Sequence, residues 1–411
     1  MKRTAIFLAV SGFTLCPALF ANADEATLQE LRAQVAVLTE RLNEMEAKTK
    51  VMEEKTNQVV ATAKPATSWA DRIQWHGDVR YRIEQTDKDS AYDDINRNRI
   101  RARIGLTAQV SDDFKAGVAL ASGSESPTSA NQTLGGGGSS KQINLDMAWI
   151  DWNFAENLNL VAGKTKNPFY TPGGSGLVWD SDYRPEGGHL SYDNGSVWAI
   201  AAYHFLNSYD GSKGTDDIEE MFGAQLGYNA TVSDKTSLKV GTSYLYIPVA
   251  GSAAFFEDSD DNAEFFGNTG IGGSHALDYE VAEVFAELNT KLAGISTMLF
   301  ADYVKNTDSD ADEDTGYSTG FKLGKIKGRG DFAFSYLYQD LEADAVFAAF
   351  ADSDFAGGGT DVKGHKYGAY LGLSKNTTAS LSYYDTEIGK VRGEGKKSDY
   401  DAIKLNVEAK F

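Results

Sequence analysis

Arginines at every second position are the first feature of this sequence that could do chemistry. Residues two apart lie on the same face of an extended strand, so each stretch would present a row of guanidinium groups on one side. Such a row attracts anions, or it pairs with carboxylates and stiffens a wall. The sequence leaves both interpretations open for Arg80, Arg82, Arg97, Arg99, Arg101 and Arg103.

The other reactive residue types form no recognisable catalytic or metal site. Cys16 is the only cysteine, and the five histidines lack the spacing of metal ligands. No nucleophile-elbow or phosphate-loop motif occurs. Lys and Arg number 39 against 59 Asp and Glu, a net charge of −20 that argues against a phosphate backbone as a partner. The sequence therefore predicts no enzyme, no metal or other cofactor and no binding to nucleic acid.

Strands must position the arginines, because apolar and polar residues alternate from Trp69 to the C-terminus. We count about sixteen such segments, bounded by Gly, Asn, Asp or Ser. Their connections alternate strictly between tight turns, such as Ser111-Asp112, and long loops, such as 123–142. This alternation is typical of an outer-membrane barrel with an even number of strands. The sequence predicts an all-β transmembrane barrel of about 16 antiparallel strands over residues 71–411.

The first residues form an export signal. Lys2 and Arg3 precede an apolar run, and Ala21-Asn22-Ala23 has the form of a cleavage site, so residues 1–23 are predicted to be a secretory signal peptide. At the other end of this N-terminal region, residues 61–70 are predicted to be a linker that leads into the barrel.

Residues 24–60 between these segments carry a continuous heptad pattern. Leu28 and Leu42 fall at a positions, whereas Leu31 and Leu38 fall at d positions. Residues at the g and following e positions have opposite charges, which favours parallel chains in register. We therefore predict a short parallel coiled coil, and an amphipathic helix lying on another surface is the alternative.

The strand pattern assigns the arginines to the barrel lumen. With Tyr81, Ile100 and Ile104 facing lipid, the arginines at intervening positions point inward, and Arg97 lies near the mouth. An arginine on the lipid face near the midplane would cost about 2–4 kcal/mol, which supports this assignment.

A loop rich in Gly and Pro, residues 167–186, is long enough to fold back into the barrel as a constriction. An exposed loop is the alternative. We expect its acids to face Arg80, Arg82, Arg99, Arg101 and Arg103 across the pore. These acids are Asp180, Asp182 and Glu186.

The remaining acidic residues concentrate in three other long loops. Loops 248–277, 306–315 and 342–362 together hold fifteen acidic residues and no Lys or Arg. We expect them to form a solvated acidic rim at the outer mouth, and loose binding of divalent ions near anionic lipid headgroups is the alternative.

The region 71–411 resembles the outer-membrane porins of Gram-negative bacteria. Within them it is most similar to the putative-porin group that carries an N-terminal coiled coil, and more distantly to phosphate-selective porins. The C-terminal Phe411, preceded by apolar residues at a spacing of two, is similar to the signal that barrel-assembly machinery recognises. The other segments that carry the resemblance are Arg97-Asn98-Arg99-Ile100-Arg101-Ala102-Arg103, Gly163-Lys164-Thr165-Lys166-Asn167-Pro168-Phe169-Tyr170, Val178-Trp179-Asp180 and Arg184-Pro185-Glu186-Gly187.

The resemblance implies a trimeric channel with an inward loop that passively passes small hydrophilic solutes and ions. We expect a homotrimer among lipid and lipopolysaccharide in the outer membrane of a Gram-negative bacterium, with the coiled coil in the periplasm. The rival hypothesis is a structural tether, in which residues 24–60 hold a plugged barrel to the peptidoglycan.

Overall fold

The computed structural model describes residues 25–62, 69–88, 94–207, 219–257, 262–308, 311–393 and 395–411. The predicted signal peptide, most of the predicted linker and most of loop 207–219 lie outside these described residues. The chain divides into two units, one up to Ser68 and one from Trp69 to Phe411. Each unit is described by itself.

The first unit contains one long helix, α1 (Glu25–Thr62). It includes the segment predicted to form a coiled coil and extends two residues into the predicted linker. The side chains of Leu38, Leu42 and Met45 are 63%, 56% and 62% exposed on this single chain. Within the described ranges, no helix is both long enough and apolar enough to cross a membrane.

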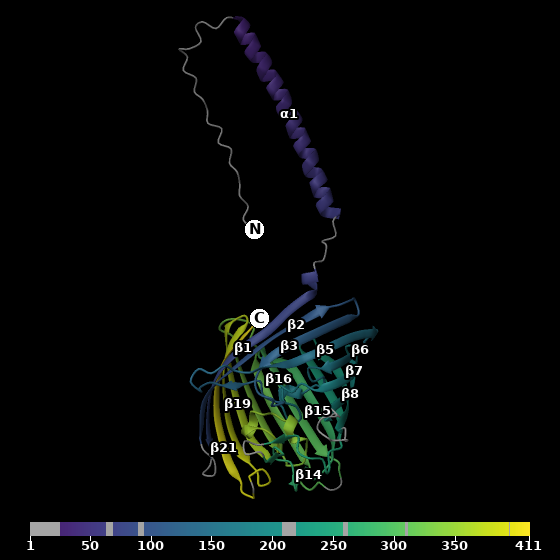
Figure 1. The fold of residues 1–411 in the computed structure, drawn as a ribbon, viewed down its shortest axis with the longest axis vertical. Helices are drawn as coiled ribbons and strands as arrows, with labels where there is room; N and C mark the ends of the chain where they lie inside the picture. Colours follow the sequence, from purple (N-terminus) through teal and green to yellow (C-terminus); the bar gives the residue numbers. More distant parts are fainter. Residues whose placement is uncertain are drawn as a thin grey trace. The chain divides into compact units, whose positions relative to one another are not determined.

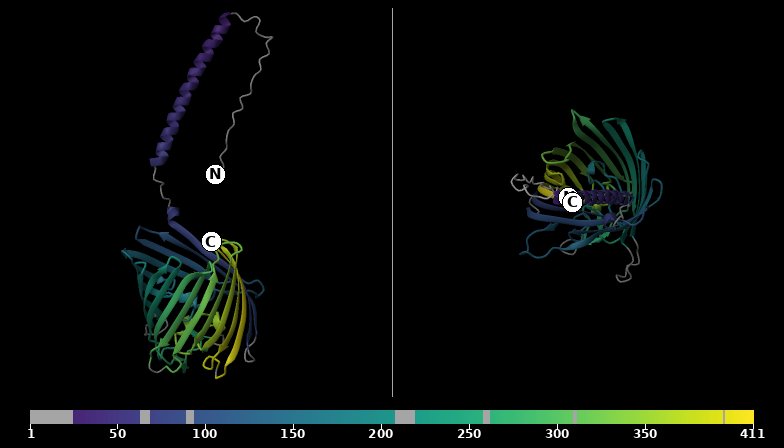
Figure 2. Two further views of the ribbon diagram at one scale, coloured as in Figure 1. Left: turned by 180° about the vertical axis from the view of Figure 1, so that it is seen from behind. Right: turned by 90° about the horizontal axis from the view of Figure 1, so that it is seen from above.

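The second unit is a closed barrel of 16 antiparallel strands, and this confirms the predicted fold (Figures 1 and 2). Each wall strand pairs with the next along the chain, and β1 also pairs with β21, which closes the cylinder. The wall strands are β1 (Ile73–Lys88), β2 (Ile95–Gln109), β3 (Phe114–Ser122), β5 (Ile143–Ala155), β6 (Leu158–Lys164), β7 (Glu186–Asp193), β8 (Val197–Asn207), β9 (Glu219–Ser233), β10 (Thr236–Ile247), β15 (Tyr279–Leu292), β16 (Ile295–Asn306), β17 (Thr315–Gly324), β18 (Phe332–Leu341), β19 (Val362–Ser374), β20 (Thr377–Ile388) and β21 (Ser398–Lys410).

The remaining elements are short. A 3-10 helix, η2 (Trp69–Arg72), leads into β1. The others lie in the long loops: β4 (Gln132–Thr133), η3 (Pro172–Gly174), β11 (Phe256–Glu257), β12 (Ala263–Glu264), β13 (Gly270–Ile271), β14 (Ser274–His275), η4 (Ala348–Phe350) and η5 (Phe355–Gly357).

Alternation along β1 shows which side chains face outward. Val79, Tyr81 and Ile83 are exposed on the outer surface, whereas Arg82 and Glu84 between them are buried. Outward apolar and inward polar residues are the pattern expected of a barrel in lipid.

The C-terminal residue completes the pairing between the first and last strands. The amide of Phe411 donates to the carbonyl of Gly77, and the amide of Gly77 donates to the carbonyl of Phe411, both at 3.0 Å. A Cβ at Gly77 would lie 2.4 Å from the Arg103 carbonyl oxygen and 2.6 Å from the Phe411 ring. Only glycine therefore fits at this point of the β1–β21 seam.

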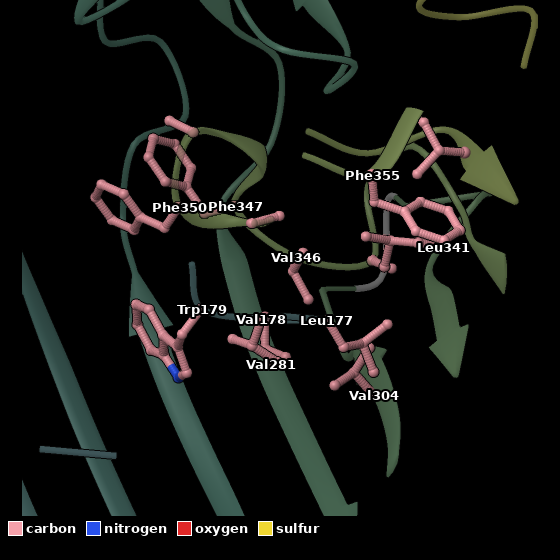
Figure 3. Close-up of a cluster of buried hydrophobic side chains, with 14 of the residues drawn as sticks. Leu177, Val178, Trp179, Val281, Val304, Leu341, Val346, Phe347, Phe350 and Phe355 are labelled. Atoms are coloured by element: carbon pink, nitrogen blue, oxygen red, sulfur yellow. The ribbon is translucent and has the colours of Figure 1, made fainter. Parts of the chain in front are cut away.

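Two long loops fold into the barrel and pack against each other. We name them L3 (residues 165–185) and L7 (residues 342–361). They share a cluster of buried apolar side chains with the barrel wall, part of which is drawn in Figure 3. L3 contributes Leu177, Val178 and Trp179, L7 contributes Val346, Phe347, Phe350 and Phe355, and the strands contribute residues such as Val281, Val304 and Leu341.

The position of L7 corrects the prediction that residues 342–362 belong to a solvated acidic rim. The run Ala345–Val346–Phe347–Ala348–Ala349–Phe350–Ala351 is buried throughout. Leaving seven consecutive apolar residues in water would forfeit their transfer free energy, roughly 25 cal/mol per Å² of apolar surface. The loop therefore turns inward, and its acidic residues go with it.

The apolar cluster occupies one side of the lumen. Its wall residues come from β8, β9, β10, β15, β16 and β18–β21, and among the described residues none comes from β1, β2 or β3. The first three strands therefore face the lumen without apolar packing from the two loops.

Candidate functional site: a charged wall and two inward loops

The inward faces of β1, β2 and β21 form a grid of charged residues, which we call the charged wall. Strand register places four residues of β1 between partners on both neighbouring strands. From the outer end, the rows are Arg97–Glu84–Lys404, Arg99–Arg82–Asn406, Arg101–Arg80–Glu408 and Arg103–Asp78–Lys410. The six predicted arginines therefore lie together on one inward surface.

L3 meets the lower rows of this wall through Asp182. Arg103 donates from Nη1 to Asp182 at 3.0 Å and from Nε to Asp78 at 2.7 Å. Arg101 donates from Nε to Asp78 at 2.9 Å and lies 3.5 Å from Asp182. Two arginines and two carboxylates thus form one network that joins the loop to the wall.

L7 meets the upper rows through Asp354, which the sequence interpretation had placed in the outer rim. Arg82 donates to both carboxylate oxygens of Asp354, at 2.8 and 2.9 Å. Lys404 on β21 donates to the same carboxylate at 2.9 Å. Burial alone would raise the pKa of Asp354, but Lys404 and Arg82 outweigh it and hold the pKa well below its usual range.

Asp180 binds backbone groups of L3 and L7 rather than arginines. Its carboxylate accepts from the amide of Asp182 at 2.6 Å and from the amide of Ser353 at 2.8 Å. Burial and, next, the neighbouring carboxylate of Asp352 raise the pKa of Asp180 to about 7. Asp180 therefore links L3 to L7, and we call its contact with Ser353 the clasp.

Ser353 ties a further loop to this clasp. Its hydroxyl donates to the carbonyl of Thr128, in the loop between β3 and β5, at 2.9 Å. Two consecutive residues of L7, Ser353 and Asp354, therefore contact L3, the loop between β3 and β5, and the charged wall.

Glu186 corrects one part of the expected arrangement. It is the first residue of β7, directly opposite Lys164 on β6, and accepts from the Lys164 ammonium at 2.8 Å. Its side chain is 62% exposed. Of the three predicted acids, only Asp182 forms ion pairs with the arginines in the described part of the chain.

Among the described residues, the other three predicted arginines, Arg97, Arg99 and Arg80, have fewer carboxylate partners than Arg101 and Arg103. Arg97 donates to Glu84 at 2.8 Å, and Arg99 lies 3.7 Å from the other oxygen of that carboxylate. Arg80 donates to the side-chain oxygen of Asn131 at 2.7 Å.

Two cavities meet at Asp354. The outer cavity, of about 930 Å³, is lined by residues including Arg97, Arg99, Lys404 and Tyr400. The other, of about 720 Å³, is lined by residues including Tyr170, Trp198, Lys239 and Lys366. Asp354 lines both, so the ion network of Asp354, Arg82 and Lys404 lies at the boundary between them.

Sequence reasoning missed Asp354 and the role of Lys404 beside it. The period of two placed Lys404 on the polar face of the last strand, but it carries no information on where a loop folds. The apolar run of L7 was the available signal. In the described ranges, no group of three or more His, Cys, Asp or Glu residues is arranged to hold a metal ion.

A closed barrel of 16 antiparallel strands with loops folded into a charged lumen defines a porin of the Gram-negative outer membrane. The family model described as "Putative porin" matches residues 86–254 and 273–411. The chain belongs to this family.

Solved structures with the same fold include two porins of other bacteria. OprB of Pseudomonas putida is 12% identical, with a TM-score of 0.56 over 85% of this chain and 96% of its own. OmpF of Salmonella typhi is 15% identical, with a TM-score of 0.50 over 84% of this chain and 99% of its own. No curated protein sequence matches the chain.

Proposed function

We propose that this porin passes small hydrophilic solutes passively along its charged wall, with L3 and L7 forming the constriction. The meeting of the two cavities at Asp354 is the observation that carries this proposal. The apolar cluster holds L3 and L7 against the opposite wall. Hydrated solutes therefore pass between the loops and the charged side chains of β1, β2 and β21.

Conductance across a planar bilayer tests the proposal. The purified protein should insert in discrete steps of current, and a bilayer that stays sealed at every voltage would contradict a channel. The constriction is tested by Asp354→Asn, which leaves Arg82 and Lys404 without their carboxylate. Removing one partner of a buried ion pair costs about 3–5 kcal/mol, so the part of L7 around residue 354 should move away from the wall and the conductance per channel should rise.

Asp312→Asn is the matched control, because it removes one loop carboxylate from an exposed position. Its conductance should equal that of the wild type. Equal conductance in Asp354→Asn would place the constriction elsewhere.

We further propose a homotrimer whose α1 helices form a parallel coiled coil in the periplasm. An even number of strands brings both ends of the barrel to the same side of the membrane. The exposed heptad side chains of α1 would then be covered by the same residues of two other copies. The rival tether is not favoured, because the family is one of porins.

A further inference from the structure

Positive charge on the charged wall exceeds the negative charge placed against it. The described inward faces of β1, β2 and β21 carry nine basic and three acidic residues, and L3 and L7 add Asp182 and Asp354. The basic residues are Arg80, Arg82, Lys88, Arg97, Arg99, Arg101, Arg103, Lys404 and Lys410, and the acidic residues are Asp78, Glu84 and Glu408.

The surplus concentrates on Arg80 and Arg99. Within the described part of the chain, Arg80 forms no ion pair, and its hydrogen bond goes to the neutral amide of Asn131. Arg99 reaches Glu84 only at 3.7 Å, and Glu84 already accepts from Arg97 at 2.8 Å. The Nε atoms of Arg80 and Arg99 are buried and have no hydrogen-bond partner. A buried donor without a partner costs about 1–3 kcal/mol, so both groups favour an acceptor from outside the chain.

Strand register brings these two arginines close together. Arg80 is directly opposite Arg101, and Arg82 is directly opposite Arg99, so Arg80 and Arg99 are diagonal neighbours on successive rows. Diagonal neighbours on one face of an antiparallel pair lie about 7–8 Å apart. A small anion with two or more oxygens can therefore accept from both guanidinium groups, and it would also relieve the repulsion between arginines in register.

The outer cavity gives such an anion access. Arg99 lines this space of about 930 Å³ together with Lys88, Arg97, Arg392 and Lys404, against the acids Glu84, Glu264 and Asp354. An anion entering from the outer end thus reaches Arg99, and strand register places Arg80 on the next row toward the periplasmic end.

We propose that Arg99 and Arg80 form a binding site for small oxyanions, so that the preferred solutes of this channel carry carboxylate or phosphate groups. The inference rests on the proposed channel function and adds a class of solute to it. The planar guanidinium fork matches both kinds of oxyanion. Asp182 and Asp354 pair with the neighbouring arginines, so Arg80, which has only the neutral Asn131, and Arg99, which has only the longer contact with Glu84, are the least neutralised cations of the wall.

Block of the chloride current by inorganic phosphate or by succinate tests the site. Each oxyanion is added to wild-type channels that conduct potassium chloride in a planar bilayer. Arg80→Gln and Arg99→Gln should each require at least about tenfold more oxyanion for the same block, because each loses a charge-assisted hydrogen bond. Arg80→Lys, which keeps the charge but loses the fork, should lie between Arg80→Gln and the wild type.

Lys322→Gln is the matched control. Lys322 is a cation near the inner end of β17, and L3 approaches it, since a Cβ at Gly174 would lie 3.9 Å from its ammonium nitrogen. This variant should be blocked as the wild type is. Equal weakening in Lys322→Gln would assign the effect to the general field of the lumen and overturn a local site.

The channel function and the oxyanion site are contradicted by different results. A wild-type protein that carries no chloride current contradicts the channel itself. A wild type that conducts chloride but responds to neither oxyanion overturns the site and leaves the channel standing. Block by only one of the two identifies that anion's group as the preferred one, and unchanged block in both glutamine variants also overturns the site.

Discussion

Two loop carboxyl groups have opposite pKa shifts, because cations outweigh burial at Asp354, whereas burial itself raises the pKa of Asp180. Asp354 lies against Arg82 and Lys404, which together hold its pKa well below the usual range. Asp180 is buried with backbone amides and with the carboxylate of Asp352 nearby, and its pKa is about 7. At neutral pH the contact of L7 with the wall is therefore fully charged, whereas the clasp between L3 and L7 is half-titrated.

The clasp should weaken as the pH rises from about 4 to about 7. The pKa of Asp180 is raised in the folded protein, so the proton binds the folded state more tightly, and stability declines between the unfolded and folded pKa values. Deuterium exchange in fragments covering L3 and L7, corrected for the intrinsic rate, should accelerate over this range and level off above it.

Asp180→Asn mimics the protonated acid and supplies the comparison for this experiment. Its exchange, after the same correction, should not change between about pH 5 and about pH 8. A variant that retains the wild-type pH dependence would assign the titration to another group.

Residue-level predictions from the sequence were correct about strands and poor about loops. A period of two decides which side of a strand a residue occupies, so the inward arginines could be assigned without coordinates. No such rule relates one loop to another. Asp182 contacts Arg103, whereas Glu186, four residues later, is on β7 directly opposite Lys164 on the adjacent strand β6.

At the scale of elements, the closing strands are the most tightly constrained. Gly77 and Phe411 exchange two backbone hydrogen bonds at the β1–β21 seam, and the Phe411 ring lies where a side chain at residue 77 would stand. The sequence indicated the last strand and its terminal aromatic residue. It gave no sign that a glycine on the first strand makes room for that ring.

Gly77→Val should reduce the fraction of folded barrel in outer-membrane preparations. Its Cβ would clash with the Arg103 carbonyl and with the Phe411 ring, and overpacking of this kind costs about 1–3 kcal/mol. The measurement is the fraction that migrates as a compact band in an electrophoretic gel before heating.

Gly328→Val is the control, because a Cβ at Gly328 meets no atom within 4 Å. This variant should fold as the wild type does. A normal folded fraction for Gly77→Val would mean that the seam adapts by moving the terminal ring.

At the scale of the whole molecule, the sequence predicts different tasks for the helical unit and the barrel. The alternation of short and long connections was sufficient to predict the barrel, because that pattern involves the entire chain from residue 71 onward. The heptads predicted the helix, which the structure extends to Thr62. Self-association of that helix stays a prediction, and it can be separated from conduction by experiment.

Deletion of residues 24–64 should leave the conductance of each barrel unchanged and should weaken the trimer. The charged wall, L3 and L7 all lie in the second unit, whereas the exposed heptads lie in the first. Mass measurement in mild detergent should give trimers for the full mature chain and a larger monomer fraction for the deletion.

Monomers alone for the full mature chain would refute the trimer. A deletion that loosened the cell envelope while leaving the mass unchanged would instead support a tether to peptidoglycan.

The carboxylate of Asp354 also has a consequence for the order of assembly. Its two partners, Arg82 and Lys404, stand on the first and last strands of the wall, so one acid holds both edges of the sheet. L7 can make both contacts only after β1 has met β21, so this double contact follows closure of the barrel. A barrel in which β1 and β21 have not yet paired therefore lacks the constriction. Once the barrel is closed, separating β1 from β21 must also break the ion pairs of Asp354 with Arg82 and Lys404.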